Sequence, residues 1–312
     1  MPQDEYSFHH ETLLYRGADG FLAGTMPFID KALAAGEPVL VAVTKPRIEQ
    51  LKRVLGCEAK RVYFADMRAL GSNPARIIPA WSQFLEDHAN NERSVRGIGE
   101  PIWPGRGPAE LTECQRHESL LNVAFPGAHR WRLLCPYDLD GLEEEVIATA
   151  RRTHPFLSAG GISRRSDDYL APCRGPGPFD GTLPEPSTEP EELTFTRSEL
   201  RTLRRFVSNR AVRAPLGIDR AEDLVLAVTE LATNSMCYGG GKGTVRMWHE
   251  AQTLLCEVRD LGHICEPLAG RTRPRPEQRS GRGLWLVNHL CDLVQIRSAP
   301  TGSVVRVHMH FA

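Results

Sequence analysis

The chain has 312 residues, of which 41% are hydrophobic and 25% are charged, and its formal net charge is −1. This length predicts two domains, each large enough to bury its own core. A net charge so close to zero produces no overall field that attracts nucleic acid or an anionic membrane, so direct binding to either is not expected.

Neither a membrane span nor a signal peptide is expected. No apolar run approaches the roughly eighteen residues that a span requires, and the amino terminus lacks a basic stretch followed by an apolar one. The eight cysteines contain no C-x-x-C pair. The sequence therefore indicates a cytoplasmic protein with reduced thiols, without a disulfide framework or a cysteine metal cluster.

From about residue 8 to residue 157, helical and strand patterns alternate. The expected helices are residues 20–35 with Asp19 as cap, 48–55, a helix opened by Pro74, 109–122 and 141–152. The expected strands are residues 38–43, 61–65, 95–98 and 131–135. Such alternation predicts an α/β domain with a largely parallel sheet.

Ligands of such folds bind beyond the carboxyl ends of the strands. The residues there form a polar and aromatic rim, which predicts a small-molecule pocket: Thr44, Lys45, Asp66, Met67, Gly99, Glu100, residues 101–103, Pro136 and Tyr137. No expected strand is followed by a phosphate-binding P-loop. Residues 239–244 imitate one, but they follow a helix and carry an extra glycine, so we reject that interpretation.

His9, His10, His117 and Glu118 raise a metal hypothesis, because histidine is a common metal ligand. Their spacings match no established metal site. Buried, hydrogen-bonded histidines are therefore the preferred interpretation.

Residues 159–190 separate the expected domains, residues 1–158 and 191–312. The segment opens on Gly160 and Gly161, and its prolines are Pro172, Pro176, Pro178, Pro184, Pro186 and Pro190. This composition predicts an extended, semi-rigid linker that is not packed against either domain.

The carboxy-terminal part is expected to be an α+β layer, with helices on one face of a mixed sheet. The expected strands are residues 193–196, 244–250, 254–259, 292–298 and 303–311, and the expected helices are 200–212, 219–238 and a later apolar one that begins after residue 281. Asp219 is the expected N-cap of the long helix, with Glu222 in the capping-box position.

Glu230 and Asn234 lie one turn apart on that helix and share a face. The amide oxygen is a hard ligand for Mg²⁺, and the carboxylate can orient or deprotonate a nucleophile. Taken alone, such a pair is more typical of a solvated helix face.

Two later segments strengthen this interpretation. A strand-like stretch ends in Asp260-Leu261-Gly262, where an acidic residue can accept the exocyclic amine of adenine. Gly281 and Gly283 stand at the mouth of the later helix. Glycines there let backbone N–H groups approach a phosphate, which the helix dipole also favours.

In this order and spacing the segments resemble the GHKL ATP-binding fold, in its anti-sigma serine kinase branch, with the motifs E-x-x-x-N, D-x-G and G-x-G-L. The resemblance implies that Asn234 coordinates Mg²⁺, that Glu230 is the catalytic general base and that Asp260 binds adenine. It implies that the remaining ATP-binding residues are Gly262, Gly281, Arg282, Gly283 and Leu284.

One position departs from the family pattern. The family often has a further glycine two residues after the D-x-G glycine, and this chain has Ile264 there, which puts the flexibility of the following lid and the retention of kinase activity in question. The lid, residues 265–280, contains Arg271, Arg273, Arg275 and Arg279. It is either a positive loop over a triphosphate or a solvated basic loop.

The first domain resembles the MEDS sensory domain, a RecA/KaiC-like α/β fold of bacterial regulators. The resemblance rests on residues 8–10, 27–29, 36–40, 97–103, 117–118 and 135–137. Since the P-loop is absent, it implies a scaffold that senses a small-molecule signal rather than hydrolysing ATP.

Together the resemblances imply a bacterial regulator of transcription in a stress response, which binds Mg-ATP and forms a homodimer. It would sequester a sigma factor, phosphorylate a serine of an anti-anti-sigma protein, or do both. The alternative is a non-catalytic, nucleotide-dependent protein-binding module. A two-component histidine kinase is disfavoured, because the proline-rich linker offers no helical hairpin for a phosphoacceptor histidine.

Overall fold

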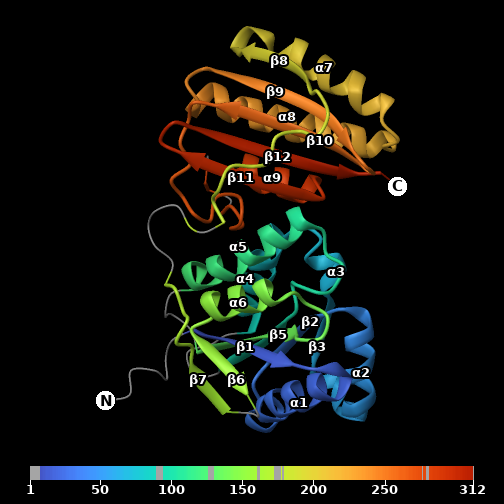
Figure 1. Ribbon diagram of the computed structural model, residues 1–312, viewed down its shortest axis with the longest axis vertical. Coiled ribbons are helices and arrows are strands. Elements are labelled where there is room, and N and C mark those ends of the chain that lie inside the picture. The colour runs from blue at the N-terminus through green and yellow to red at the C-terminus, as the bar shows by residue number, and fades with distance from the viewer. Residues whose placement is uncertain are drawn as a thin grey trace. The chain divides into compact units, whose positions relative to one another are not determined.

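The computed structural model describes residues 8–88, 94–125, 130–159, 162–171, 177, 179–275, 277–278 and 281–311. Contacts divide the chain into two compact units, residues 1–174 and residues 175–312 (Figure 1). Predictions that involve Gly160, Gly161, Pro172, Pro176, Pro178, Arg279 and Ser280 lie outside the described residues. Among the described helices, none has the length and apolar character that a bilayer crossing requires.

The N-terminal unit is built on a seven-stranded sheet with the order β3-β2-β4-β5-β1-β6-β7. Its strands are β1 (His9–Tyr15), β2 (Val39–Val43), β3 (Tyr63–Asp66), β4 (Val95–Gly99), β5 (Trp131–Asp138), β6 (Phe156–Ala159) and β7 (Ile162–Arg165). Every ladder is parallel except that between β6 and β7. The predicted largely parallel sheet is confirmed.

Helices cover both faces of this sheet, with α1 and α2 on one face and α4, α5 and α6 on the other (Figure 1). Their bounds are α1 (Gly17–Ala35), α2 (Lys45–Leu55), η2 (Gly56–Arg61), α3 (Met67–Leu70), η3 (Pro74–Arg76), α4 (Ile77–His88), α5 (Pro108–Ala124) and α6 (Glu144–Thr153). Arg16, rather than Asp19, is the N-cap of α1. Asp19 lies in the first turn, where its negative charge interacts favourably with the positive end of the helix dipole.

Part of the predicted ligand rim is interior. Tyr137 is 1% exposed, because β5 continues to Asp138 and keeps this side chain inside the sheet layer. Met67 and Glu100 are also buried. The Glu100 carboxylate accepts hydrogen bonds from the backbone N–H and hydroxyl of Thr44, at 3.2 and 3.3 Å, and burial raises its pKa.

The C-terminal unit contains a five-stranded sheet with the order β11-β12-β10-β9-β8. Its elements are β8 (Glu191–Thr196), η4 (Arg197–Glu199), α7 (Leu200–Arg213), α8 (Ile218–Tyr238), β9 (Lys242–Glu250), β10 (Thr253–Asp260), α9 (Arg282–Leu290), β11 (Leu293–Ala299) and β12 (Gly302–His310). Side chains of α7, α8 and α9 share one hydrophobic core with one face of the sheet, which includes Val245, Cys256 and Val307. The predicted layer of helices on one face is confirmed.

The C-terminal sheet is antiparallel in all four described ladders, so the expected mixed pairing is wrong. Tight turns join β9 to β10 and β11 to β12, and such hairpins impose antiparallel pairing. Two successive helices, α7 and α8, connect β8 to β9. The ladder between β8 and β9 is antiparallel.

The N-cap of the long helix α8 lies two residues earlier than expected. Its N-cap is Gly217, whose carbonyl accepts the first helical hydrogen bond, from the N–H of Ala221 at 3.0 Å. Asp219 therefore lies in the first turn, and the predicted capping box with Glu222 does not form. The helix still places residues 230 and 234 one turn apart, as the sequence predicts.

The outer face of this sheet, opposite the helices, carries a buried charge network. Glu257 is 0% exposed, and its carboxylate accepts from Arg246 at 3.2 Å, from Arg259 at 2.6 Å and from Arg306 at 2.7 and 2.9 Å. The register of β9, β10 and β12 places Arg246, Glu257 and Arg306 in one row. One carboxylate thus joins three strands.

Residues 181–188, named the strap here, lie against this outer face. The carbonyls of Gly181 and Pro184 accept hydrogen bonds from Arg297 and Arg306, at 3.0 and 2.8 Å. The Glu185 carboxylate accepts from both Arg246 and Arg259 at 3.1 Å, and these bonds lower its pKa. The expectation of an unpacked linker is therefore wrong for the strap, because arginines of the sheet donate hydrogen bonds to its carbonyl and carboxylate oxygens.

Acid is expected to destabilise the C-terminal unit through His308 on β12. Burial and the adjacent Arg306 charge lower the pKa of His308 from 6.5 to about 4. Between pH 6.5 and pH 4, His308 is therefore protonated in the unfolded chain but mostly neutral in the folded chain. The free energy of unfolding thus falls as the pH drops through this range. This loss amounts to about 2 kcal/mol at pH 5.

Urea unfolding of the full chain at pH 7.5 and pH 5 measures this effect. We expect His308→Gln to reduce the acid-dependent loss by about that amount, since glutamine does not titrate. The matched control is His310→Gln, which changes an exposed histidine two residues away. Equal pH dependence in the two variants would contradict the prediction.

Candidate functional site

Asp260, the last residue of β10, is held by three hydrogen bonds. Its Oδ1 accepts from the Gly262 backbone N–H and the Ser303 hydroxyl, each at 2.8 Å, and its Oδ2 accepts from the Ser235 hydroxyl at 2.6 Å. A carboxylate oxygen accepts two hydrogen bonds, so Oδ2 retains one acceptor position. The carboxylate is thus fixed in direction and still able to accept from a ligand.

Two glycines permit the close packing around this carboxylate. A Cβ atom on Gly239 would lie 2.5 Å from Cγ of Asp260, and one on Gly262 would lie 2.8 Å from the carbonyl oxygen of Tyr238. Any side chain at either position would therefore displace the carboxylate or the backbone beside it. From the sequence, Gly239 was predicted only to end a helix, and its contact with Asp260 was not expected.

Glu230 and Asn234 face the first turn of α9. A Cβ atom on Gly283 would lie 3.0 Å from Oε2 of Glu230 and 3.3 Å from Nδ2 of Asn234. Gly281, the N-cap of α9, has φ +86°, a left-handed conformation that favours glycine. The structure therefore brings the predicted carboxylate–amide pair against the predicted glycine turn.

A cavity of about 270 Å³ connects these groups. Its lining contains the predicted residues Asn234, Asp260, Gly262, Gly281, Gly283 and Leu284. Glu230 is not in the lining but lies beside Gly283, and the Arg282 side chain is exposed at the start of α9. The polar groups thus gather at the glycine turns.

Sequence reasoning missed several lining residues: Leu231, Ser235, Tyr238, Gly239, Val258, His263, Ser303 and Val305. Ser235 carried a weak signal, because it follows Asn234 on the same helix. Ser303 carried none, since it reaches Asp260 only through the pairing of β12 with β10, in which the two residues are directly opposite. Leu231, Val258 and Val305 give the cavity an apolar wall, which suits a flat aromatic ring.

The lid and the residue that precedes it, Ile264, are anchored at several described positions. The Ile264 N–H donates to the Ser298 hydroxyl at 2.7 Å, and its side chain packs against the core. The buried Asn288 amide on α9 donates to the Gly270 carbonyl at 2.9 Å. Arg271 is 3% exposed, which contradicts the expectation of a solvated loop at this position, while Arg273 and Arg275 are exposed.

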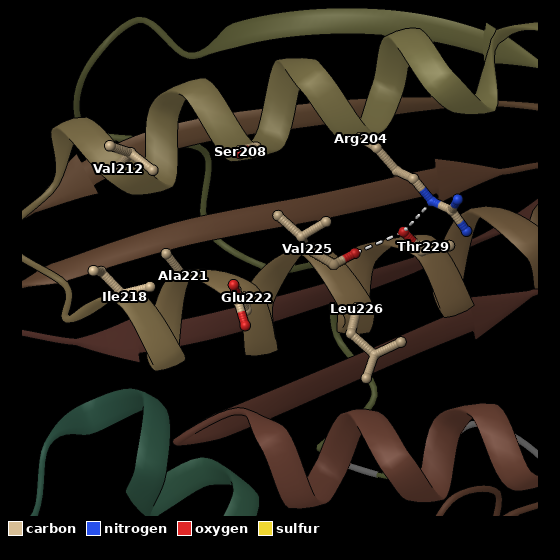
Figure 2. Close-up of a pocket in the computed structure, with 9 residues that line it drawn as sticks. All are labelled: Arg204, Ser208, Val212, Ile218, Ala221, Glu222, Val225, Leu226 and Thr229. Carbon is tan, nitrogen blue, oxygen red and sulfur yellow. Dashed lines mark hydrogen bonds between the residues drawn. The ribbon is translucent and has the colours of Figure 1, made fainter.

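A second hollow, of about 410 Å³, lies between α7 and α8 (Figure 2). Apolar side chains make up much of its lining, including Val212, Ile218 and Leu226. Arg204 donates to the Thr229 hydroxyl there, at 3.3 Å. No predicted nucleotide-binding residue lines it. Successive residues of α8 thus serve different surfaces, because Thr229 faces this hollow and Glu230 faces α9.

Comparison with known families matches two separate parts of the chain. Residues 9–155 match the MEDS model, the methanogen/methylotroph, DcmR sensory domain, and residues 193–309 match the histidine kinase-like ATPase domain. Both matches agree with the resemblances inferred from the sequence. No curated protein matches the chain.

Two solved structures share similarity with part of the chain. The RsbU and RsbW domains of a Mycobacterium tuberculosis protein match at 16% identity with a TM-score of 0.31, over 39% of this chain and 32% of that chain. The Acinetobacter baumannii histidine kinase AdeS matches at 12% identity with a TM-score of 0.24, over 39% of this chain and 68% of that chain. The chain thus spans about a third of the length of the first.

Proposed function

We propose that this chain, which joins a MEDS domain to a histidine kinase-like ATPase domain, is an ATP-dependent anti-sigma regulator. Its C-terminal domain binds Mg-ATP and sequesters a sigma factor, phosphorylates a serine of an anti-anti-sigma protein, or does both. The observation that supports this best is the convergence of Asn234, Asp260 and Gly283 on one cavity. A small-molecule signal at the MEDS domain, a cytoplasmic homodimer and a role in stress response belong to the same proposal.

We assign roles to the residues on the basis of their positions. Asp260 accepts the exocyclic amine of adenine on its remaining acceptor position, while Leu231, Val258 and Val305 contact the ring. The glycine turn at the start of α9 offers backbone N–H groups to the phosphates. In this proposal Asp260 contacts adenine, and the glycine turn contacts the triphosphate.

Asn234 and Glu230 supply the remaining chemistry. The Asn234 amide oxygen would hold Mg²⁺, and it fits this role because it is a hard donor facing the glycine turn, 3.6 Å from the Cβ position of Gly283. Mg²⁺ would neutralise charge on the triphosphate. The adjacent Glu230 carboxylate would accept the proton of the attacking serine hydroxyl.

The test measures transfer of the labelled γ-phosphate of ATP to candidate anti-anti-sigma proteins. We expect Glu230→Gln to reduce transfer by about 10²- to 10⁴-fold while ATP binding persists, because a general base contributes to the chemical step. The matched control is Glu222→Gln, on the exposed part of the same helix and in the lining of the other hollow. Transfer that Glu230→Gln leaves unchanged would exclude the assigned base.

The second candidate, a non-catalytic nucleotide-dependent module, is favoured by the anchored Ile264. Its bond to Ser298 and its packing hold the start of the lid. ATP binding without transfer to any partner serine would support this candidate. The histidine kinase alternative finds no support, because the described residues between β7 and β8 contain no helix for a dimerising hairpin.

A further inference from the structure

We propose that the MEDS domain contains a metal site, formed by His10, Glu118, Cys135 and His154, that binds a borderline divalent cation of the Zn²⁺ class. His10 lies on β1, Glu118 on α5 and Cys135 on β5, and His154 is the C-cap of α6. Each is at most 1% exposed, and one ligand atom from each lies within 4.8 Å of the others. Four separate elements thus direct their donors toward one point.

The spacing of the donors suits a tetrahedral ion. The Glu118 Oε2 atom lies 3.1 Å from Nε2 of His10 and 3.2 Å from Nε2 of His154. The Cys135 Sγ lies 3.4 Å from Nε2 of His10. Tetrahedral Zn²⁺ with bonds of about 2.0–2.3 Å requires ligands about 3.3–3.8 Å apart. These three distances lie inside that range or within a few tenths of an ångström of it. The remaining pairs of donors, all within 4.8 Å, would approach by up to about 1 Å around an ion.

The hydrogen bonds on the far side of each imidazole identify which nitrogen carries the proton. His154 Nδ1 lies 2.7 Å from the Ala150 carbonyl, which only accepts, so Nδ1 is the donor. His10 Nδ1 lies 3.1 Å from Oδ1 of Asn122, whose Nδ2 donates to the Thr153 carbonyl at 2.8 Å, and this fixes Oδ1 as the acceptor. In the neutral form of each ring, Nε2 therefore presents its lone pair to the cluster.

Such outer hydrogen bonds are the usual support of a metal-binding histidine. The buried Glu118 carboxylate lies beside both Nε2 atoms, so its negative charge requires either a proton on an imidazole or a cation at the centre. A buried carboxylate without a donor or a cation is strongly disfavoured. A cation at the centre satisfies both imidazoles, the carboxylate and the thiolate together.

The donor set indicates the kind of ion and its role. Two imidazoles, one thiolate and one carboxylate suit Zn²⁺. They do not suit Mg²⁺ or Ca²⁺, which prefer oxygen ligands alone. With four protein ligands no coordination position remains for a substrate, so the site is structural. The cation would tie the central strands β1 and β5 to the helices α5 and α6.

Two of these ligands, His10 and Glu118, were among the candidate metal residues predicted from the sequence. His9 and His117 are not members of the cluster. His9 lies instead against the Phe156 ring, with centroids 3.9 Å apart, and its Nε2 lies 3.1 Å from the Ser163 hydroxyl. Residue spacing did not reveal the site because its ligands lie in four distant segments.

Cobalt binding to the full, untagged chain tests the proposal. The background replaces the exposed Cys57, Cys237 and Cys265 with serine, and also Cys173, which lies outside the described residues, because additional thiols would also bind metal. We expect one Co²⁺ per chain, with the intense visible absorption of tetrahedral cobalt and a thiolate charge-transfer band, both lost on addition of Zn²⁺. X-ray absorption of the Zn²⁺ form should show one sulfur and three nitrogen or oxygen neighbours.

Two variants separate the cluster from other thiols. Cys135→Ser should abolish the charge-transfer band and weaken Zn²⁺ binding by more than about 100-fold, the upper end of the loss expected for an outer-shell change. Cys114→Ser, which changes another buried cysteine of the same domain, should retain both. Octahedral or substoichiometric cobalt, a sulfur-free Zn²⁺ shell, or equal behaviour of the two variants would overturn the proposal in favour of an imidazolium–carboxylate pair.

Discussion

Replacement of Asp260 with asparagine is expected to weaken ATP binding about 10- to 100-fold, the loss that corresponds to one charged hydrogen bond. Asparagine keeps the size of the side chain but turns one acceptor oxygen into an NH₂ donor. That donor opposes either the Ser235 hydroxyl and the adenine amine or the Gly262 N–H and the Ser303 hydroxyl. In either orientation of the amide, the site loses one hydrogen-bond acceptor that it uses.

Isothermal titration of the full chain with Mg-ATP measures this loss. Ser235→Ala should weaken binding less, about 3- to 10-fold, because it removes one donor and leaves the carboxylate charge. Asp223→Asn is the matched control, since it neutralises a partly exposed aspartate on α8, 3.3 Å from Arg220. If Asp260→Asn binds ATP as tightly as this control, Asp260 does not contact adenine.

Replacement of Glu257 with alanine is expected to lower the free energy of unfolding of the C-terminal unit by about 3–5 kcal/mol, the usual result of removing one partner of a buried ion pair. The variant would leave Arg246 and Arg306 without the carboxylate that they share. Arg306 is 5% exposed, so solvent cannot replace that partner fully. The loss should exceed that of any exposed ion pair in this unit.

Denaturant unfolding of the full chain provides the measurement. Glu192→Ala is the matched control, because Glu192 is exposed and its carboxylate lies 4.0 Å from Arg246. That change should cost about 0–1 kcal/mol. A Glu257→Ala loss no larger than the control would mean that water, rather than Glu257, satisfies the arginines.

The local parts of the candidate site were predictable, and its supporting contacts were not. Helical spacing is sufficient to place Glu230 and Asn234 on one face, and a glycine pair before an apolar run marks the start of α9. Ser303 lies 43 residues from Asp260 and becomes its neighbour only through strand register. No local pattern encodes that pairing.

The fold was predictable where hydrophobic periodicity was strong. Strand β1 was missed, although it lies between β5 and β6 in the sheet, because its first residues are His9, His10 and Glu11. Those polar side chains hide the strand pattern. The start of α8 was misplaced because Asp219 is a good cap by residue type, while the backbone enters the helix at Gly217.

The strap determines where the C-terminal domain can be cut from the chain. A fragment that starts at residue 191, where the sequence placed the boundary, removes the carbonyls that receive Arg297 and Arg306 and the carboxylate that receives Arg246 and Arg259. Such a fragment would expose a cationic surface that the intact protein neutralises. An expression fragment should therefore begin before Gly181, and nucleotide affinities measured on shorter pieces would describe a domain with an altered electrostatic surface.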